Sequence, residues 1–273
     1  MRILVTGATA NIGRMVVDEL LDLGALHDPG VIEIRAFTVD PAKVALPPGV
    51  EVVTGFFNRP DRVAAALDGV DRMYLAPHIP TVTAVCRAAA EAGVRHIVDL
   101  AGVKGLHWQA VEDAVEASGI PFTHLEPGEF MANSTSWAPQ IRAGDEVRDA
   151  WGDAANAPIA QEDIAAIAAR VLLSEDHHGR SYELTGPETL SRRQQVAAIG
   201  AELGRDLTFV ELSGDEAVAH YRSLMGDFGD WYLNGLAQLA EHPQPALPTV
   251  EALLNRPAMS YAEWVRRHAD LFR

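Results

Sequence analysis

The sequence contains few of the residues that mark secreted, nucleic-acid-binding or membrane proteins. Of its 273 residues only Cys86 is a cysteine, which excludes a disulfide within the chain. Lys and Arg number 22 against 38 Asp and Glu, for a formal net charge of -16. Nucleic acids and anionic membranes both require a basic surface, and no apolar run is long enough to span a bilayer. We therefore expect a small-molecule partner, neither nucleic acid nor membrane, and no bound metal.

The start of the chain leaves little room for a targeting segment. The first predicted strand begins by Ile3, so we expect no signal or transit peptide and a cytoplasmic location. Cys86 lies in an Ala-rich helical pattern, where a small core side chain is more typical than a nucleophile. Apolar residues make up 48% of the chain, which is ample for a folded core.

The strongest local pattern lies in the first 23 residues. Ile3 to Val5 predicts a buried strand, a turn follows at Gly7, and apolar residues then recur at helical spacing up to Leu23. A strand, a small-residue turn and a helix N-terminus in this order are typical of a pyrophosphate cradle. The residues predicted to contact a nucleotide here are Gly7, Thr9, Ala10, Asn11, Ile12 and Gly13.

Strands and helices alternate as far as residue 125. Such alternation predicts right-handed crossovers, a parallel sheet and an α/β, Rossmann-like doubly wound fold. The remaining strands of this region are predicted at residues 31–37, 50–54, 72–76, 96–100 and 121–125, and its helices at 61–67, 81–92 and 106–117.

The second half has a looser pattern. We predict two domains: a Rossmann-like dinucleotide-binding domain over residues 1–155 and a smaller α/β lobe on the substrate side over 156–273, which contributes in part to the main sheet. Aromatic residues in it and near it favour an aromatic substrate, although ordinary packing is the alternative for each. These aromatic candidates are Trp108, Trp137, Trp151, Trp231 and Tyr232. A homodimer is left open.

Several segments, in order along the chain, resemble the NmrA-like group of atypical short-chain dehydrogenases. They are TGATANIG at residues 6–13, AGVRHIV at 92–98, SGIPFTHLEPGEFMAN at 118–133, PIAQEDIA at 158–165 and YELTGPE at 182–188. The resemblance covers most of the chain through Glu211. It implies an NAD(P)-binding fold, with members that include quinone, dye and isoflavone-type reductases as well as redox sensors.

The chain departs from this family around the predicted nucleotide. Ala10 replaces the middle Gly, where a methyl group either obstructs the pyrophosphate or is harmless. The family's Arg after the second strand would clamp a 2′-phosphate, but Val39 replaces it and Asp40 follows, so NAD is favoured over NADP without excluding it. Phe56 or Phe57 is either a wall for the adenine or a core residue. The nucleotide contacts predicted on the later strands are Val39, Asp40, Phe56, Ala76 and Pro77.

The usual catalytic residues of the family are missing. Short-chain dehydrogenases use Tyr-x-x-x-Lys after the fifth strand, and no Tyr lies between residues 100 and 122. Trp108 occupies the position of a His or Lys that the group often keeps. Asp99 and Glu126 lie near the carboxyl ends of predicted strands, and either carboxylate could orient His107 as a general acid or base. We therefore predict His107, Asp99 and Glu126 as catalytic residues.

Three functions compete on this basis. The first is an NAD(P)-dependent oxidoreductase that transfers hydride to an electron-poor small molecule, such as a quinone or a conjugated ketone. The second is a non-redox enzyme on the same scaffold, a lyase, hydrolase or cyclase. The third is an NmrA-like protein that senses the dinucleotide without turnover. We rank the reductase first, since electron-poor acceptors take hydride with little help from a protein acid.

Overall fold

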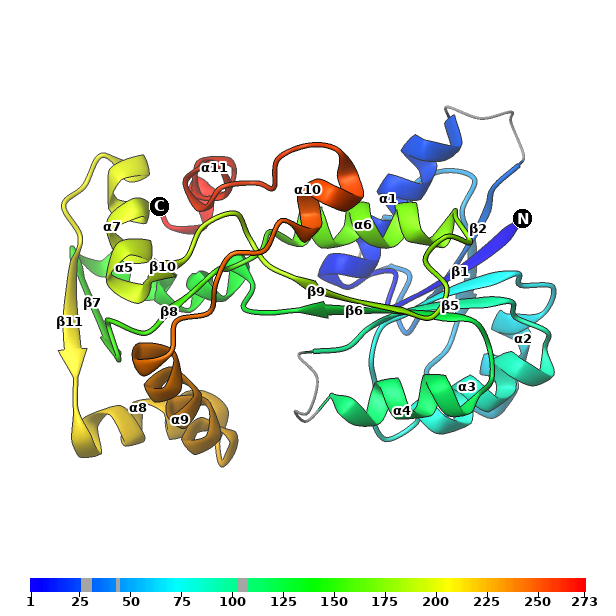
Figure 1. Cartoon of the computed structure of the whole chain (residues 1–273), viewed down its shortest axis with the longest axis horizontal. Coiled ribbons are helices and arrows are strands. Elements are labelled where there is room, and N and C mark those ends of the chain that lie inside the picture. Colours follow the sequence, from blue (N-terminus) through cyan, green and yellow to red (C-terminus); the bar gives the residue numbers. More distant parts are fainter. Residues whose placement is uncertain (26–30, 43–44, 103–107) are drawn as a thin grey trace. The chain divides into compact units, whose positions relative to one another are not determined.

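Strands and helices alternate from the first residues of the computed structural model, which describes residues 1–25, 31–42, 45–102 and 108–273. Figure 1 shows this order along the chain. The elements are β1 (Arg2–Thr6), α1 (Asn11–Ala25), β2 (Glu33–Thr38), β3 (Glu51–Thr54), α2 (Pro60–Leu67), β4 (Arg72–Leu75), α3 (Val82–Glu91), β5 (His96–Leu100), α4 (Gln109–Ala117) and β6 (Phe122–Pro127).

The second half contains short strands between helices. Its elements are a 3₁₀ helix (Met131–Trp137), α5 (Ala138–Ala143), β7 (Glu146–Ala150), β8 (Ala155–Asn156), α6 (Gln161–Leu172), β9 (Arg180–Leu184), β10 (Leu190–Ser191), α7 (Arg192–Leu203), β11 (Thr208–Leu212), α8 (Gly214–Met225), α9 (Phe228–Glu241), α10 (Thr249–Leu254), α11 (Tyr261–Arg267) and a closing 3₁₀ helix (Ala269–Leu271). Among the described residues, no helix has the length and apolar character needed to cross a membrane.

The contacts divide the chain into two units. The first unit comprises residues 1–128, 161–184 and 252–255, and the second comprises 129–160, 185–251 and 256–273. The chain therefore leaves the first unit after β6 and returns to it for α6 and β9. The predicted domain division after residue 155 stays a prediction.

The first unit is built on a seven-stranded parallel sheet in the order β3-β2-β1-β4-β5-β6-β9. This confirms the predicted Rossmann-like α/β fold. Successive strands run outward from β1 to β3 and then resume on the other side of β1 with β4. The strand order thus reverses between β1 and β4, and open α/β sheets bind ligands outside the carboxyl ends of the strands at such a reversal.

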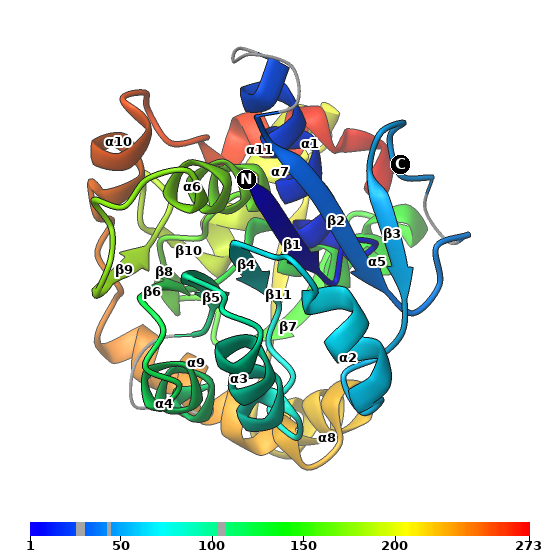
Figure 2. The same ribbon diagram turned by 90° about the vertical axis from the view of Figure 1, so that its right-hand side faces the viewer.

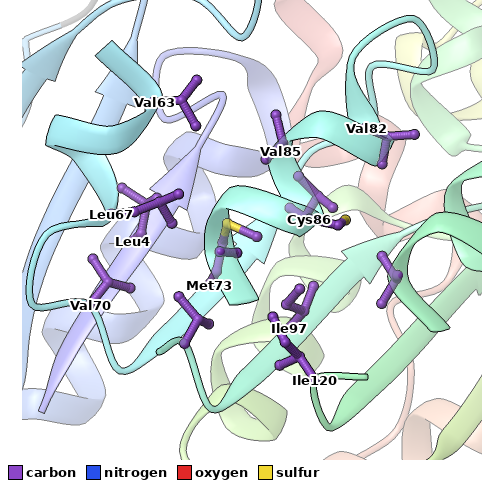
Figure 3. Packing of buried hydrophobic residues seen from close by; sticks show 14 of the residues in the cluster. Leu4, Val63, Leu67, Val70, Met73, Val82, Val85, Cys86, Ile97 and Ile120 are labelled. Carbon is purple, nitrogen blue, oxygen red and sulfur yellow. The ribbon is translucent and has the colours of Figure 1, made fainter. Parts of the chain in front are cut away.

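Helices cover both faces of this sheet. Figure 2 shows α1 and α6 on one face and α2, α3 and α4 on the other. Leu4 faces the second group, because it packs in the core beneath α2 and α3 together with Met73 and Ile97 of neighbouring strands. Figure 3 shows Cys86 of α3 pointing into the same core. With 1% of its surface exposed, Cys86 is the core residue that the sequence predicts.

The second unit has two small sheets and its own cores. β7 and β11 pair in parallel, and β8 and β10 pair antiparallel. Helix α7 begins with a capping box, in which the Ser191 hydroxyl accepts from the Gln194 N–H and the Gln194 side chain accepts from the Ser191 N–H. One core of this unit gathers around Trp264, which is 1% exposed. The sequence pattern predicts helices at residues 192–203, 216–225 and 231–240, which correspond to α7, α8 and α9, but it does not predict β7, β8, β10 or α10.

Candidate nucleotide-binding and active site

The turn between β1 and α1 is held in a shape that only small residues allow. Gly7 has a φ of +62°, in the left-handed region, and its carbonyl accepts from the Ala10 N–H at 2.8 Å. A Cβ on Gly13 would lie 2.3 Å from the Gly7 carbonyl oxygen, so the start of helix α1 lies in close contact with the loop that contains Gly7. Ala10 is not among the residues with positive φ, so its methyl group introduces no backbone strain. The strand, turn and helix that the sequence predicts are therefore formed in the first unit, with the turn directly before the 15-residue helix α1, and the nucleotide contacts of this turn stay a prediction.

Thr6 fixes the end of β1 to the neighbouring strand. Its hydroxyl donates to the Tyr74 carbonyl at 2.9 Å and accepts from the Ala76 N–H at 2.7 Å. Ala76, which a nucleotide is predicted to contact, thus lies against the turn, where a Cβ on Gly7 would meet the Ala76 Cβ at 3.0 Å. Pro77 follows it after the end of β4. The β1 turn and the end of β4 therefore meet at the reversal of strand order.

A pocket of about 400 Å³ opens beside this turn. Its volume lies within the range of small-ligand sites. Its lining comes from the turn and from the carboxyl ends of β2 and β3: Gly7, Thr9, Ala10, Phe37, Thr38, Val39, Asp40, Gly55, Phe56 and Phe57. Of the predicted contacts, Asn11, Ile12, Gly13, Ala76 and Pro77 are not part of this lining.

The part of the pocket rim that follows β2, residues 38–40, has no basic side chain. Val39 is 63% exposed on the rim, and Asp40 accepts from the Ala42 N–H at 3.0 Å, as in an Asx turn. Thr38 shares a hydrogen bond of 2.6 Å with Thr9 of the β1 turn. Lys43, a residue that would restore positive charge near a 2′-phosphate, lies outside the described residues.

The two phenylalanines after β3 have different surroundings. Phe57 packs on Phe37, with ring centroids 5.5 Å apart, and belongs to the edge of the core. Phe56 meets His78 edge to face, with centroids 4.9 Å apart. His78 is held by a 2.8 Å hydrogen bond to Thr81 at the start of α3. Both rings line the pocket, and Phe56 is the one of the pair that does not also pack on the core.

The predicted catalytic residue Asp99 lies inside the sheet rather than on its open edge. Its carboxylate is fully buried and pairs with His124 Nδ1 of β6 at 2.6 Å. Burial raises the pKa of Asp99, an effect that the hydrogen bond to His124 opposes. His107, the partner predicted from the sequence, lies outside the described residues. Sequence reasoning missed His124, whose signal is an ionisable residue in the middle of a predicted buried strand.

Glu126 lies two residues beyond His124, on the same face of β6. It is 7% exposed, and its Oε1 is buried without a hydrogen-bond partner among the described residues. Glu112 of α4 is 1% exposed, and its pKa is raised by burial and by the charge of Glu126. Its Oε2 accepts from Gln109 at 3.1 Å. Asp99, Glu126 and Glu112 thus place three carboxyl groups around one imidazole between the sheet and α4.

The aromatic candidates divide between packing and exposure. Trp137 is 3% exposed and donates from Nε1 to Asp149 at 2.5 Å, which makes it a core residue of the second unit. Asp149 also pairs with Arg192 and accepts from the Tyr221 hydroxyl at 2.6 Å. Tyr232 donates to Glu129 at 3.2 Å. By contrast, Trp108, Trp151 and Trp231 are 39%, 41% and 48% exposed.

Comparison with known proteins also indicates a protein that binds NAD(P)H. Residues 7–175 match a family described as NAD(P)H-binding. A (4-alkanoyl-5-oxo-2,5-dihydrofuran-3-yl)methyl phosphate reductase of Streptomyces griseus is 36% identical, and an NAD(P)H azoreductase of Xenophilus azovorans is 30% identical, each over 99% of both chains. An NADPH-dependent quinone oxidoreductase of Escherichia coli, solved with NADPH, superposes with a TM-score of 0.84 at 26% identity over all of both chains.

These relatives decide between the three functions. They confirm the predicted reductase, and they give no support to the non-redox enzyme or the sensor. The turn fits NAD or NADP. Gly7 has a positive φ and Gly13 has no room for a side chain, so backbone N–H groups at the helix N-terminus can approach a pyrophosphate closely. The chain belongs to the NAD(P)H-binding, NmrA-like family of atypical short-chain dehydrogenases, and it is an NAD(P)H-dependent oxidoreductase.

Proposed function

We propose that the protein reduces the carbon–carbon double bond of a conjugated carbonyl compound. The type of acceptor follows from the name of the Streptomyces relative's substrate, whose dihydrofuran ring carries a ring carbonyl and an alkanoyl group. In such a ring the double bond is conjugated to both carbonyls. Hydride addition to the far carbon leaves a negative charge that both carbonyl oxygens share.

The observation that carries this proposal is the missing Tyr-x-x-x-Lys. A simple ketone becomes a strongly basic alkoxide on reduction, and a phenol positioned by a lysine supplies its proton. A doubly activated alkene becomes a stabilised enolate, which can take up its proton after the hydride step without a phenol–lysine pair at the carbonyl oxygen. A chain with no Tyr between residues 100 and 122 is therefore suited to the second acceptor and poorly suited to the first.

We further propose NADH as the preferred donor. Bound NAD(P)H supplies the hydride, and the residues that would hold it are those of the β1 turn and the rim of the pocket. Gly7, Thr9 and Ala10 would lie along the pyrophosphate, with Asn11, Ile12 and Gly13 at the helix N-terminus behind them. Val39 and Asp40 would face the adenosine ribose, where a carboxylate suits a free 2′-hydroxyl better than a phosphate. Phe56 would wall the adenine, and Ala76 and Pro77 would border the β4 side.

The test compares acceptors in the same assay. We expect a 3-acyl-2(5H)-furanone and a naphthoquinone to oxidise NADH in the presence of the protein. The matched saturated 3-acyl lactone and cyclohexanone should give no oxidation above background. Equal rates with cyclohexanone and the furanone would contradict the proposal, because a simple ketone needs the missing acid.

Two expectations about the protein's setting belong here as well. We propose a cytoplasmic location, which fractionation of the native source would test. A homodimer is proposed on the same footing, and light scattering of the purified protein would test it, a monomer mass being the contradicting result.

A further inference from the structure

Five titratable groups among the described residues of α4, β5 and β6 form one cluster, here called the inner acid cluster. Its members are Asp99, Glu112, Glu116, His124 and Glu126. All lie in the first unit, so their arrangement is set by one sheet and one helix. The sequence predicts Asp99 and Glu126 as catalytic residues with His107 as their partner, and the proposed function leaves the roles of Glu112, Glu116 and His124 open.

Four members are buried far beyond what carboxylates and imidazoles usually tolerate. Asp99 and His124 are 0% exposed, Glu112 is 1% and Glu126 is 7%. Each keeps one buried polar atom without a hydrogen-bond partner in the described part of the chain, namely Asp99 Oδ1, Glu112 Oε1, His124 Nε2 and Glu126 Oε1. A buried polar atom without a hydrogen-bond partner costs free energy of folding. These four atoms therefore indicate exchangeable protons or small ligands between the side chains.

The cluster also has an outer and an inner end. Glu116 on α4 has a side chain that is 51% exposed, and its Oε1 lies 3.6 Å from His124 Nε2. The other ring nitrogen, Nδ1, bonds Asp99 at 2.6 Å. Glu126 is the second-to-last residue of β6, near the carboxyl end, where parallel strands present ligands. Contacts thus link Glu116 at the surface to His124 and Asp99, and Glu126 lies on the same face of β6, toward its carboxyl end.

The charges of the inner acid cluster favour keeping at least one proton on its buried groups. With all four buried groups ionised, three carboxylates would face one imidazolium, and burying that excess charge is expensive. Burial raises the pKa of Asp99, and the charge of Glu126 raises it further. Burial lowers the pKa of His124, but the hydrogen bond and charge of Asp99 outweigh it, and the net shift is upward.

The other titratable groups around Asp99 do not compete for this proton. Tyr74 of β4 and Cys86 of α3 also face it, and burial together with the charge of Asp99 raises the pKa of each. Both therefore stay neutral near pH 7. The retained proton belongs to the carboxyl groups and His124.

We propose that the inner acid cluster is the proton store of the reductase, with Glu126 as its outlet and Glu116 as its inlet. The inference rests on the proposed function for its chemistry. The acceptor gains hydride from the bound coenzyme at its β carbon, and its π electron pair moves onto the carbonyl oxygen. A proton from the Glu126 carboxyl then converts the enolate to the neutral product. Glu126 regains a proton from His124, which is reloaded from solvent through Glu116.

The first experiment needs no coenzyme and no acceptor. Infrared spectra of the wild-type protein at pH 7.5 should contain the C=O stretching band of a protonated carboxylic acid, and that band should shift in D₂O. We expect the band to be lost in Glu126→Gln. It should persist in Glu183→Gln, which removes an exposed carboxylate of β9 directly in register with Glu126. A wild-type spectrum without the band would overturn the proton store whatever the enzyme reduces.

The second experiment separates proton supply from hydride transfer. With a 3-acyl-2(5H)-furanone, Glu126→Gln should lower steady-state turnover roughly 100-fold, in the range typical of a lost general acid. The first-turnover oxidation of NADH should stay within about threefold of wild type, since the hydride step precedes the proton. Equal losses in Glu126→Gln and Glu183→Gln would overturn the assignment.

The two proposals fail in different ways. If no conjugated acceptor oxidises NADH, the proposed function fails, and the infrared result still decides whether the cluster holds a proton. If Glu126→Gln does not fold, the D₂O shift of the wild-type band and the titration of His124 by ¹⁵N NMR give the answer. A His124 that titrates below its ordinary pKa would contradict the store.

Discussion

Replacement of Val39 by Arg should shift coenzyme use toward NADPH. Val39 lies on the rim of the pocket after β2, where the family has an Arg. A guanidinium there would form a charge-assisted pair with a 2′-phosphate, worth about 1.5–3 kcal/mol. Since Val39 is 63% exposed, solvent screening keeps the gain near the lower figure. We therefore expect roughly a tenfold lower KM for NADPH, because 1.4 kcal/mol corresponds to a factor of ten.

The assay measures KM and kcat for NADH and NADPH with one acceptor at a fixed ionic strength. The KM for NADH should change less than threefold, since its ribose hydroxyls present no phosphate. Val31→Arg is the matched control, because Val31 is 45% exposed just before the amino end of β2 and does not line the pocket. An unchanged ratio of the two KM values in Val39→Arg, with the fold intact, would show that the 2′-position lies elsewhere.

Three further changes test the cradle and the stability of each unit. Gly13→Ala puts a methyl group 2.3 Å from the Gly7 carbonyl oxygen, so calorimetry should show about 1–3 kcal/mol lost stability and titration weaker NADH binding. Unfolding in urea should show the free energy of unfolding falling as pH drops below 6.5, because burial lowers the pKa of His96 to about 3 and only the unfolded chain takes up the proton in this range. The full loss approaches about 4–5 kcal/mol near pH 3. His96→Gln should remove this contribution to the pH dependence. Asp149→Asn leaves Arg192 buried without its counter-charge and should cost about 3–5 kcal/mol in thermal unfolding, whereas an unchanged midpoint would argue against that pair.

The parts of the fold that could be predicted are those with strong local periodicity. β1 and α1 follow from an apolar run, a glycine turn and a helical repeat, all within 25 residues. β7 is hard to predict because Val147 is its only large apolar residue, because Asp149 is buried although charged, and because its partner, β11, lies about 60 residues later. β8 and β10 are two residues each and depend on each other. Pairing between distant short segments leaves no signal in a local pattern.

In the candidate site, too, the features that depend on local sequence could be predicted and those that depend on tertiary packing could not. Gly7 and Gly13 could be predicted as close-approach positions because the turn between a strand and a helix demands them. Asp99 was placed at the ligand edge from its position near the end of β5, whereas its side chain is fully buried against His124. Sequence position gives the end of a strand, but the face depends on which helix covers it. The covering helix is α4, whose Glu112 had no predicted role.

Stability alone gives no reason for acids at positions 99, 112 and 126. The neighbouring buried positions of α4 are Val111, Ala114 and Val115, which shows that this side of the helix accepts apolar packing. Buried ionisable groups usually cost more than apolar residues of similar size, so a sequence under selection for stability alone would lose them. Groups of this kind with perturbed pKa values concentrate at functional sites. An enzyme without the family's phenol and lysine still has to deliver one proton for each hydride, and the inner acid cluster is where the described fold keeps acids that packing does not require.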